Sequence, residues 1–132
     1  MLTLQLLVWN DKNGNVYFSV EDKEESLKAI DEAIKTLEER TCLKFVEKTS
    51  ERNFLIFKQL KGCFSAIGAQ GRGAQPVSIG VGCGVKPVVI HEIMHALGFV
   101  HEQSRLDRDN YVDVLTARIK PGLWMIYFVV NQ

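Results

Sequence analysis

All three histidines of this chain lie within eleven residues, in the segment HEIMHALGFVHE at positions 91–102. Side chains four positions apart on a helix lie on one face, about one turn apart, so His91 and His95 can bind the same ion. If the helix simply continued, His101 would lie roughly 9 Å further along the axis and could not reach that ion. The chain therefore has to leave the helix and turn back before His101.

Gly98 is the residue at which this turn is expected. Glycine adopts a positive φ at little cost and is the usual residue just past a helix end. With the helix ended there, His101 can return as a third ligand, and the fourth corner of a tetrahedron stays open for water. Three protein ligands plus water are typical of a catalytic zinc ion rather than a structural one. The spacing thus predicts one zinc ion per chain, bound by His91, His95 and His101.

Glu92 lies beside the predicted ligand face, where its carboxylate can take a proton from the attacking water and later deliver it to a leaving amine. The pattern H-E-x-x-H alone is only suggestive, because a histidine on an apolar helix is usually a satisfied core residue. The complete pattern H-E-x-x-H-x-x-G-x-x-H has a chance of roughly one in 10⁵ in a chain of this composition. It therefore favours a catalytic zinc site with Glu92 as general base.

Composition excludes several classes of partner. At 132 residues the chain is long enough for one compact domain. Its sixteen basic and sixteen acidic residues cancel, so no global field attracts nucleic acid or an anionic membrane.

The apolar segment Leu2–Trp9 lacks a basic residue ahead of it and a cleavage site, which predicts a core strand rather than a signal peptide. The apolar run Leu123–Val130 is too short to span a bilayer. It indicates a buried strand or a chain that ends before its packing partner.

Periodicity predicts an α+β domain. The segment EESLKAIDEAIKTLEER has apolar residues at helical spacing, which indicates an amphipathic helix with one buried stripe. The stripe consists of Leu27, Ile30, Ala33, Ile34 and Leu37. Short runs rich in strand formers occur at Cys42–Val46, Phe54–Phe57 and Val77–Val81. The glycine-rich GAQGRG at positions 68–73 is expected to be a loop, since glycine weakens helices and strands. A sheet is expected to pack against the histidine helix.

The segment HEIMHALGFVHEQSRLDRDNYV resembles the signature of the astacins, secreted zinc endopeptidases of the metzincin group. TCLKF, GCFSAIG and VSIGVGC also resemble astacin segments, so the likeness covers about residues 14–122. Within the family, the chain resembles the fish hatching enzymes and their relatives. The resemblance implies a metzincin-like upper subdomain: a twisted, mostly parallel sheet with an N-terminal amphipathic helix and a zinc-binding helix. It also implies a secreted protein that cleaves protein or peptide substrates.

The resemblance extends to individual residues. It implies that His91, His95 and His101 are zinc ligands and that Glu92 is the general base. Glu102 corresponds to the residue that contacts the new amino terminus after propeptide removal. The residues expected to hold the turn behind the ligand helix are Arg105, Asp107, Arg108 and Asp109.

Three cysteines leave one without a partner if the others pair. The family likeness implies a Cys63–Cys83 disulfide, whereas Cys42 corresponds to a cysteine whose partner lies near the family domain's carboxyl end.

Residues 123–132 form a divergent apolar tail that does not resemble the family. Astacin domains continue into a second subdomain with a methionine turn and a tyrosine near the zinc ion, so residues 1–132 are expected to be a single, C-terminally incomplete peptidase domain. The primary prediction is a zinc metalloendopeptidase. The alternative is a catalytically impaired zinc-binding fragment or a non-catalytic binding module, because the lost groups would position substrate and stabilise charge.

Overall fold

The computed structural model describes residues 14–21 and 24–129 and divides the chain into two compact units, residues 1–99 and 100–132. The strand predicted at Leu2–Trp9 lies outside the described residues. The elements of the first unit are β1 (Asn15–Glu21), α1 (Glu24–Arg40), β2 (Lys44–Glu47), β3 (Phe54–Lys58), β4 (Cys63–Ser65), β5 (Ala74–Ile79) and α2 (Lys86–Ala96).

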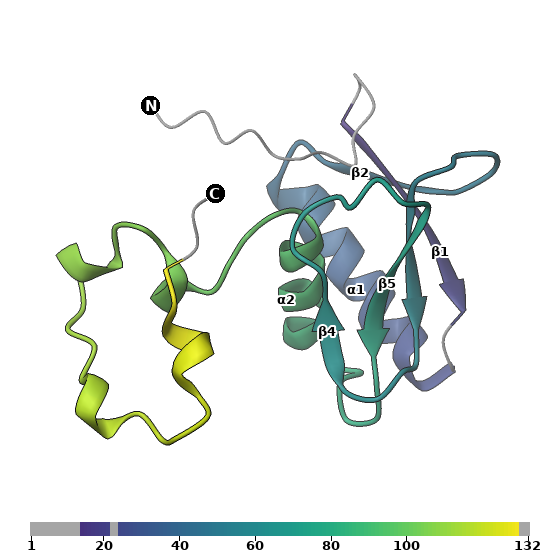
Figure 1. Cartoon of the computed structure of the whole chain (residues 1–132). Coiled ribbons are helices and arrows are strands. Elements are labelled where there is room, and N and C mark those ends of the chain that lie inside the picture. Colours follow the sequence, from purple (N-terminus) through teal and green to yellow (C-terminus); the bar gives the residue numbers. More distant parts are fainter. Residues whose placement is uncertain (1–13, 22–23, 130–132) are drawn as a thin grey trace. The chain divides into compact units, whose positions relative to one another are not determined.

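The strands form one sheet in the order β2-β1-β3-β5-β4. β1 pairs in parallel with β2 and β3, and β3 pairs in parallel with β5, while the edge strand β4 runs antiparallel to β5. Figure 1 shows α1 and α2 together on one face of this sheet, and the two helices pack against each other. The predicted α+β fold with a mostly parallel sheet is therefore confirmed.

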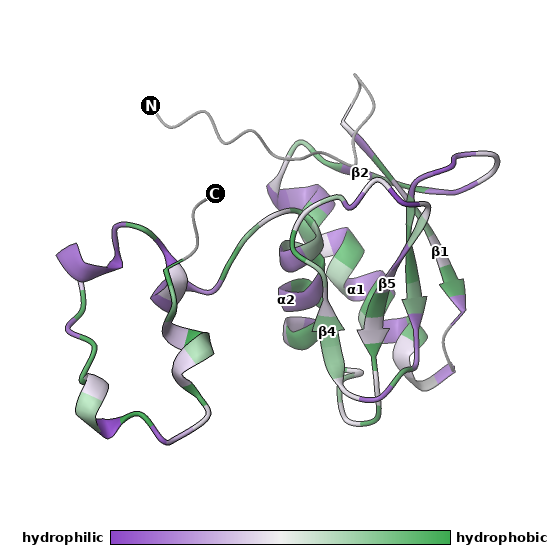
Figure 2. Ribbon diagram, viewed as in Figure 1, coloured by the Kyte–Doolittle hydropathy of each residue, from purple (hydrophilic) through white to green (hydrophobic). Residues whose placement is uncertain are grey.

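The core of the first unit lies between the sheet and its helices. Leu55 and Phe57 of β3 are fully buried, and Phe57 contacts the ring of Phe18 edge to face at 6.1 Å between centroids. Hydrophobic and hydrophilic residues alternate along α1 in Figure 2, as expected for an amphipathic helix. Its buried face contains Ser26, Ala29, Ile30, Ala33 and Leu37.

The prediction that Leu27 belongs to this buried stripe is wrong, because its side chain is 42% exposed. At 100° per residue, Leu27 lies to one side of the line through Ala29, Ile30 and Ala33. The sheet covers that line and not its flank. Ile34, on the same flank, is only partly buried.

The second unit has no strand among its described residues. It contains the short 3-10 helices η1 (Glu102–Ser104), η2 (Arg108–Asn110), η3 (Thr116–Arg118) and η4 (Trp124–Tyr127). The apolar run that begins at Leu123 does not form a buried strand in its described part. It forms η4 instead, and the side chains of Met125 and Phe128 are exposed. A strand there would need a neighbouring strand to pair with, and the described part of this unit offers none.

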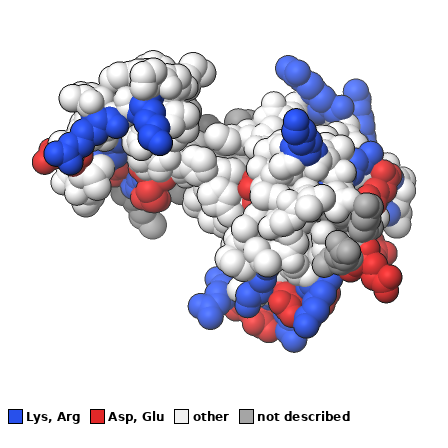
Figure 3. Space-filling view, turned by 90° about the horizontal axis from the view of Figure 1, so that it is seen from below, with Lys and Arg blue, Asp and Glu red and all other residues white. Residues whose placement is uncertain are grey.

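The surface charge agrees with the balanced composition. On the face in view in Figure 3, acidic and basic side chains are interspersed. Searching the described residues for a helix with the length and apolar character needed to cross a bilayer finds none.

Candidate metal centre

Helix α2 positions the first two histidines of the motif. Its inner face, which includes Val89, Glu92 and Ile93, is buried against the unit's core. His91 is exposed and His95 is partly buried, and their ring centroids lie 4.5 Å apart. The four-residue spacing therefore brings the two imidazoles side by side, as the sequence predicts.

The helix ends as expected from Gly98. Ala96 is the last helical residue, and Gly98 has a φ of +105°. The Gly98 amide donates to the His95 carbonyl at 2.9 Å and the Phe99 amide donates to the Met94 carbonyl at 3.0 Å, which is a Schellman motif. A Cβ atom added at Gly98 would meet nothing within 4 Å, so glycine is needed here for its backbone conformation and not for space.

His101 follows this turn and is the N-cap residue of η1. His91, His95 and His101 each offer one ring nitrogen, and these nitrogens lie within 4.8 Å of one another. Within the described residues, they are the one group of three metal-ligating side chains that is close enough to share an ion. Three imidazoles without a thiolate suit zinc and leave a coordination position open.

The ring of His95 is oriented by the same turn. Its Nδ1 lies 2.7 Å from the carbonyl oxygen of Phe99. A carbonyl oxygen can only accept, so Nδ1 carries the proton and Nε2 keeps its lone pair for a metal ion. Backbone carbonyls commonly orient metal-binding histidines in this way. Sequence reasoning missed this contact because the partner is a main-chain atom, which no residue type reveals.

Glu92 is the charged residue of the buried face of α2. Its side chain is only 5% exposed, and its Oε2 atom is buried without a hydrogen-bond partner among the described residues. A buried carboxylate oxygen without a donor is unfavourable unless a group that binds at the site interacts with it. The unsatisfied oxygen and the histidine donor set both fit a metal site with a water molecule as substrate.

The charged residues after His101 form ion pairs with one another. Arg105 donates from Nε and Nη2 to the two carboxylate oxygens of Asp107, each at 3.0 Å. Its Nη1 atom also lies 3.5 Å from the Oε2 atom of Glu102. The hydrogen bonds from Arg105 lower the pKa of Asp107, and the same pairing raises the pKa of Arg105. Glu102 is exposed.

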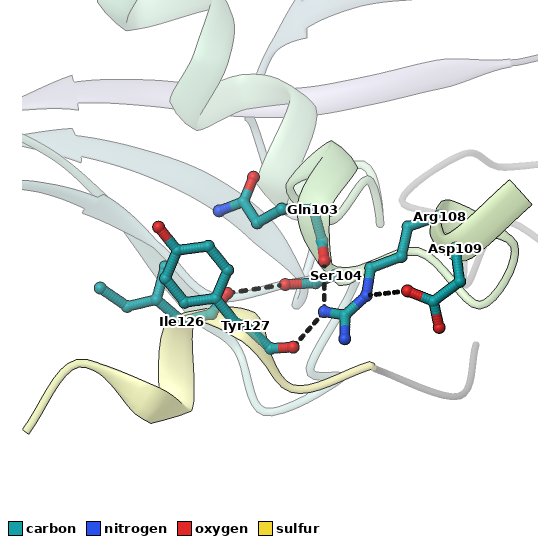
Figure 4. A network of polar contacts seen from close by, with 6 residues as sticks. All are labelled: Gln103, Ser104, Arg108, Asp109, Ile126 and Tyr127. Carbon is teal, nitrogen blue, oxygen red and sulfur yellow. Dashed lines mark hydrogen bonds and ion pairs between the residues drawn. The ribbon is translucent and has the colours of Figure 1, made fainter. Parts of the chain in front are cut away.

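Arg108 joins the two ends of the second unit. Its Nη1 donates to the Gln103 carbonyl at 2.7 Å and to the Tyr127 carbonyl, and its Nε donates to Asp109 at 3.1 Å. Beside it, the Ser104 hydroxyl donates to the Ile126 carbonyl at 3.1 Å (Figure 4). These bonds hold η4 against η1 and close the intervening loop.

The cysteines pair as the family likeness implies. Cys63 and Cys83 form a disulfide with a Cα–Cα distance of 5.7 Å, which ties the start of β4 to the segment before α2. Cys42 is an exposed free thiol.

Comparisons with known proteins agree with this site. The model of the astacin peptidase family matches residues 3–132. Zinc metalloproteinase nas-23 of Caenorhabditis elegans is 43% identical over 97 residues, which are 72% of this chain and 18% of that protein. Meprin A subunit alpha of Rattus norvegicus is 49% identical over 75 residues, which are 57% of this chain and 10% of that protein. The chain thus spans less than a fifth of either relative.

A solved structure also resembles this chain. High choriolytic enzyme 1 of Oryzias latipes, a hatching enzyme zinc-protease, superimposes with a TM-score of 0.85 at 29% sequence identity. The match covers 99% of this chain and 68% of that chain.

Proposed function

The chain belongs to the astacin family of zinc-dependent peptidases, and from that membership we propose that it hydrolyses peptide bonds within protein substrates. His91, His95 and His101 hold one zinc ion, and Glu92 is the general base. The observation that carries this proposal is the clustering of three ring nitrogens within 4.8 Å. The buried, unpartnered carboxylate oxygen on the same helix supports it.

Each group has a separate task in the reaction. When bound, zinc polarises a carbonyl as a Lewis acid and lowers the pKa of water toward neutrality. The Glu92 carboxylate accepts a proton from the attacking water and donates it to the leaving amine as the peptide bond breaks. The hydrogen bond from His95 to the Phe99 carbonyl keeps the imidazole in one tautomer throughout.

The outer strand β4 is the proposed surface for substrate. It lies at the edge of the sheet with β5 as its neighbour and packs against α2. An extended peptide can add to such an edge through main-chain hydrogen bonds, which gives affinity with little demand on sequence. This fits cleavage within protein chains rather than binding of a small molecule.

An extracellular location is also proposed. The Cys63–Cys83 disulfide supports it, because such bonds persist in oxidising compartments and are rare in the cytosol.

Two measurements test the proposal. Purified protein is expected to contain about one zinc ion per chain, and His101→Ala is expected to lose it, as read by metal analysis. Glu92→Gln is expected to retain zinc but lose about 10²- to 10⁴-fold in kcat/KM on a quenched peptide. Glu39→Gln, on the exposed face of α1, is the matched control and is expected to match the wild type.

Equal background cleavage by the wild type and Glu92→Gln would contradict the peptidase. If zinc were still bound at one ion per chain, the chain would then be a zinc-binding module without turnover. Loss of both zinc binding and cleavage would reject the metal centre itself.

A further inference from the structure

A buried glutamine interrupts the apolar face of β5. Gln75 is only 4% exposed, and its side-chain amide bonds to three backbone groups of the loop at positions 66–70. Nε2 donates to the carbonyls of Ala66 at 3.2 Å and Gly68 at 3.0 Å. Oε1 accepts from the Gln70 amide at 3.0 Å. Both ends of one buried side chain are therefore used to fix the shape of this loop.

The same loop contacts the end of the zinc-binding helix. The amide of Gly68 donates to the carbonyl of His95 at 2.9 Å, so this carbonyl accepts one bond from the loop and one from Gly98. Gly68 is buried and has a φ of +71°. Gln75 thus holds the carbonyl of Gly68 while the amide of Gly68 holds the backbone of His95. A continuous series of hydrogen bonds connects β5 to a proposed metal ligand.

The loop also continues the edge strand. β4 ends at Ser65, and the residues bonded to Gln75 follow at once. The other end of β4 is fixed separately, because the Gly62 carbonyl accepts from the Ser78 hydroxyl at 2.7 Å and from the Gly80 amide at 3.1 Å. Bonds from β5 therefore reach both ends of β4, and the loop at the Gln75 end bonds to His95 of α2.

We propose that Gln75 is a positioning residue that fixes the edge strand β4 and the metal ligand His95 relative to each other. The inference rests on the proposed function, in which β4 takes the substrate and His95 binds zinc. Without the Gln75 amide, the loop loses three bonds and keeps the weaker set from Gln70 to the carbonyls of Ile67 and Gly68. The Gly68 amide is then less firmly positioned against the carbonyl of His95. A merely structural glutamine would stabilise the fold without affecting the metal.

Paired variants separate these roles. Gln75→Met keeps the length of the side chain but removes all three bonds, and Ser78→Ala removes the bond at the other end of β4. Zn²⁺ affinity is measured by competition with a chromophoric chelator, and Gly68 amide exchange is measured by NMR in the metal-free full chain. Gln75→Met is expected to weaken Zn²⁺ binding by about tenfold, as for other groups that orient metal ligands, and to speed Gly68 exchange. Ser78→Ala is expected to change Zn²⁺ affinity by less than about twofold.

Cleavage kinetics add a second distinction. Both variants are expected to raise KM, since both loosen β4, whereas only Gln75→Met is expected to lower kcat as well. If Gln75→Met fails to fold, the wild type still tests the coupling. Linkage requires that Zn²⁺ binding in turn slow the exchange of the Gly68 amide, and exchange unchanged by Zn²⁺ would overturn the proposal.

The remaining outcomes are distinguishable. A wild-type chain that takes up no Zn²⁺ would refute the proposed function and this inference with it. Equal Zn²⁺ affinities in Gln75→Met and Ser78→Ala would refute the inference alone and leave the metal centre standing.

Discussion

The two units of the chain are stabilised in different ways. In the first unit, side chains from the sheet and both helices form one buried hydrophobic core. In the described part of the second unit, Ser104 is the one buried side chain, and large apolar residues such as Tyr111 and Met125 are exposed. That unit is held by hydrogen bonds, most of all those from Arg108 to backbone carbonyls.

The boundary between the two units falls inside the histidine motif. The division between the units falls after Phe99, so His91 and His95 belong to the packed unit and His101 to the hydrogen-bonded one. Apolar burial is insensitive to direction, whereas hydrogen bonds depend on geometry and on charge. Variants that remove apolar volume should therefore affect the first unit, and variants that remove donors or charge should affect the second.

The largest effect is expected from truncation in the core. Phe57→Ala removes a fully buried ring and should lower the free energy of unfolding by about 3–5 kcal/mol. Phe128→Ala removes the same atoms from a residue that is 62% exposed. It should change the free energy of unfolding by less than about 0.5 kcal/mol. Urea unfolding followed by circular dichroism measures both. Equal losses would mean that the second unit has a core of its own.

Removal of the disulfide should have the next largest effect. Cys63 and Cys83 are 20 positions apart, and opening a loop of that size by a double substitution to serine should cost about 3 kcal/mol. Cys42→Ser is the control and should leave the unfolding midpoint unchanged, because this thiol is exposed and free. A midpoint insensitive to the double substitution would show that the paired strands alone fix the start of β4.

Removal of the Arg108 side chain should loosen only the second unit. The side chain of Arg108 is only 14% exposed. A hydrogen bond from its charged guanidinium to a backbone carbonyl contributes roughly 1.5–3 kcal/mol to stability. Arg108→Ala should therefore speed hydrogen exchange near η1 and η4 by about tenfold or more, with the amides of β3 unchanged. Arg118→Ala, at an exposed arginine of the same unit, is the matched control. Unchanged exchange in Arg108→Ala would contradict the role assigned to it.

The smallest effect concerns pH. Hydrogen bonds from Arg105 lower the pKa of Asp107 in the folded chain, so their stabilisation is present above the unfolded pKa and is lost as pH falls through the folded pKa. The Asp107 carboxyl should titrate by NMR below the ordinary value of about 3.9. Arg105→Gln should raise that midpoint toward the ordinary value. The effect should shrink in high salt, since the pair is exposed to solvent.

Secondary structure could be predicted where its signal is local. The segment predicted as an amphipathic helix coincides with α1, Glu24–Arg40, because helical periodicity depends only on near neighbours. The strand predicted at Phe54–Phe57 is β3, which ends one residue later. The strand predicted at Val77–Val81 is β5, which instead covers Ala74–Ile79. Pairing with β3 sets these bounds, and pairing is not local.

Strands without a strong local signal were missed. β1 was not predicted at Asn15–Glu21, although β2 and β3 both pair with it. β4 has only three residues, Cys63–Ser65, and exists as a strand because it pairs with β5. Gln75 was missed as well. A polar residue in the apolar strand AQPVSI was the available signal, but its partners lie in a loop whose position depends on the sheet.

The sequence by itself predicted which histidines cluster, because His91, His95 and His101 lie in one short segment whose geometry follows from helix pitch and from the freedom of glycine. Tertiary structure alone decided what surrounds that segment. The burial of Glu92 and the contact between Gly68 and His95 join residues distant in the chain, and they depend on strand order and on the packing of α2 against the sheet. Contacts between distant residues form only when the whole sheet assembles, so no short pattern of residues can encode them.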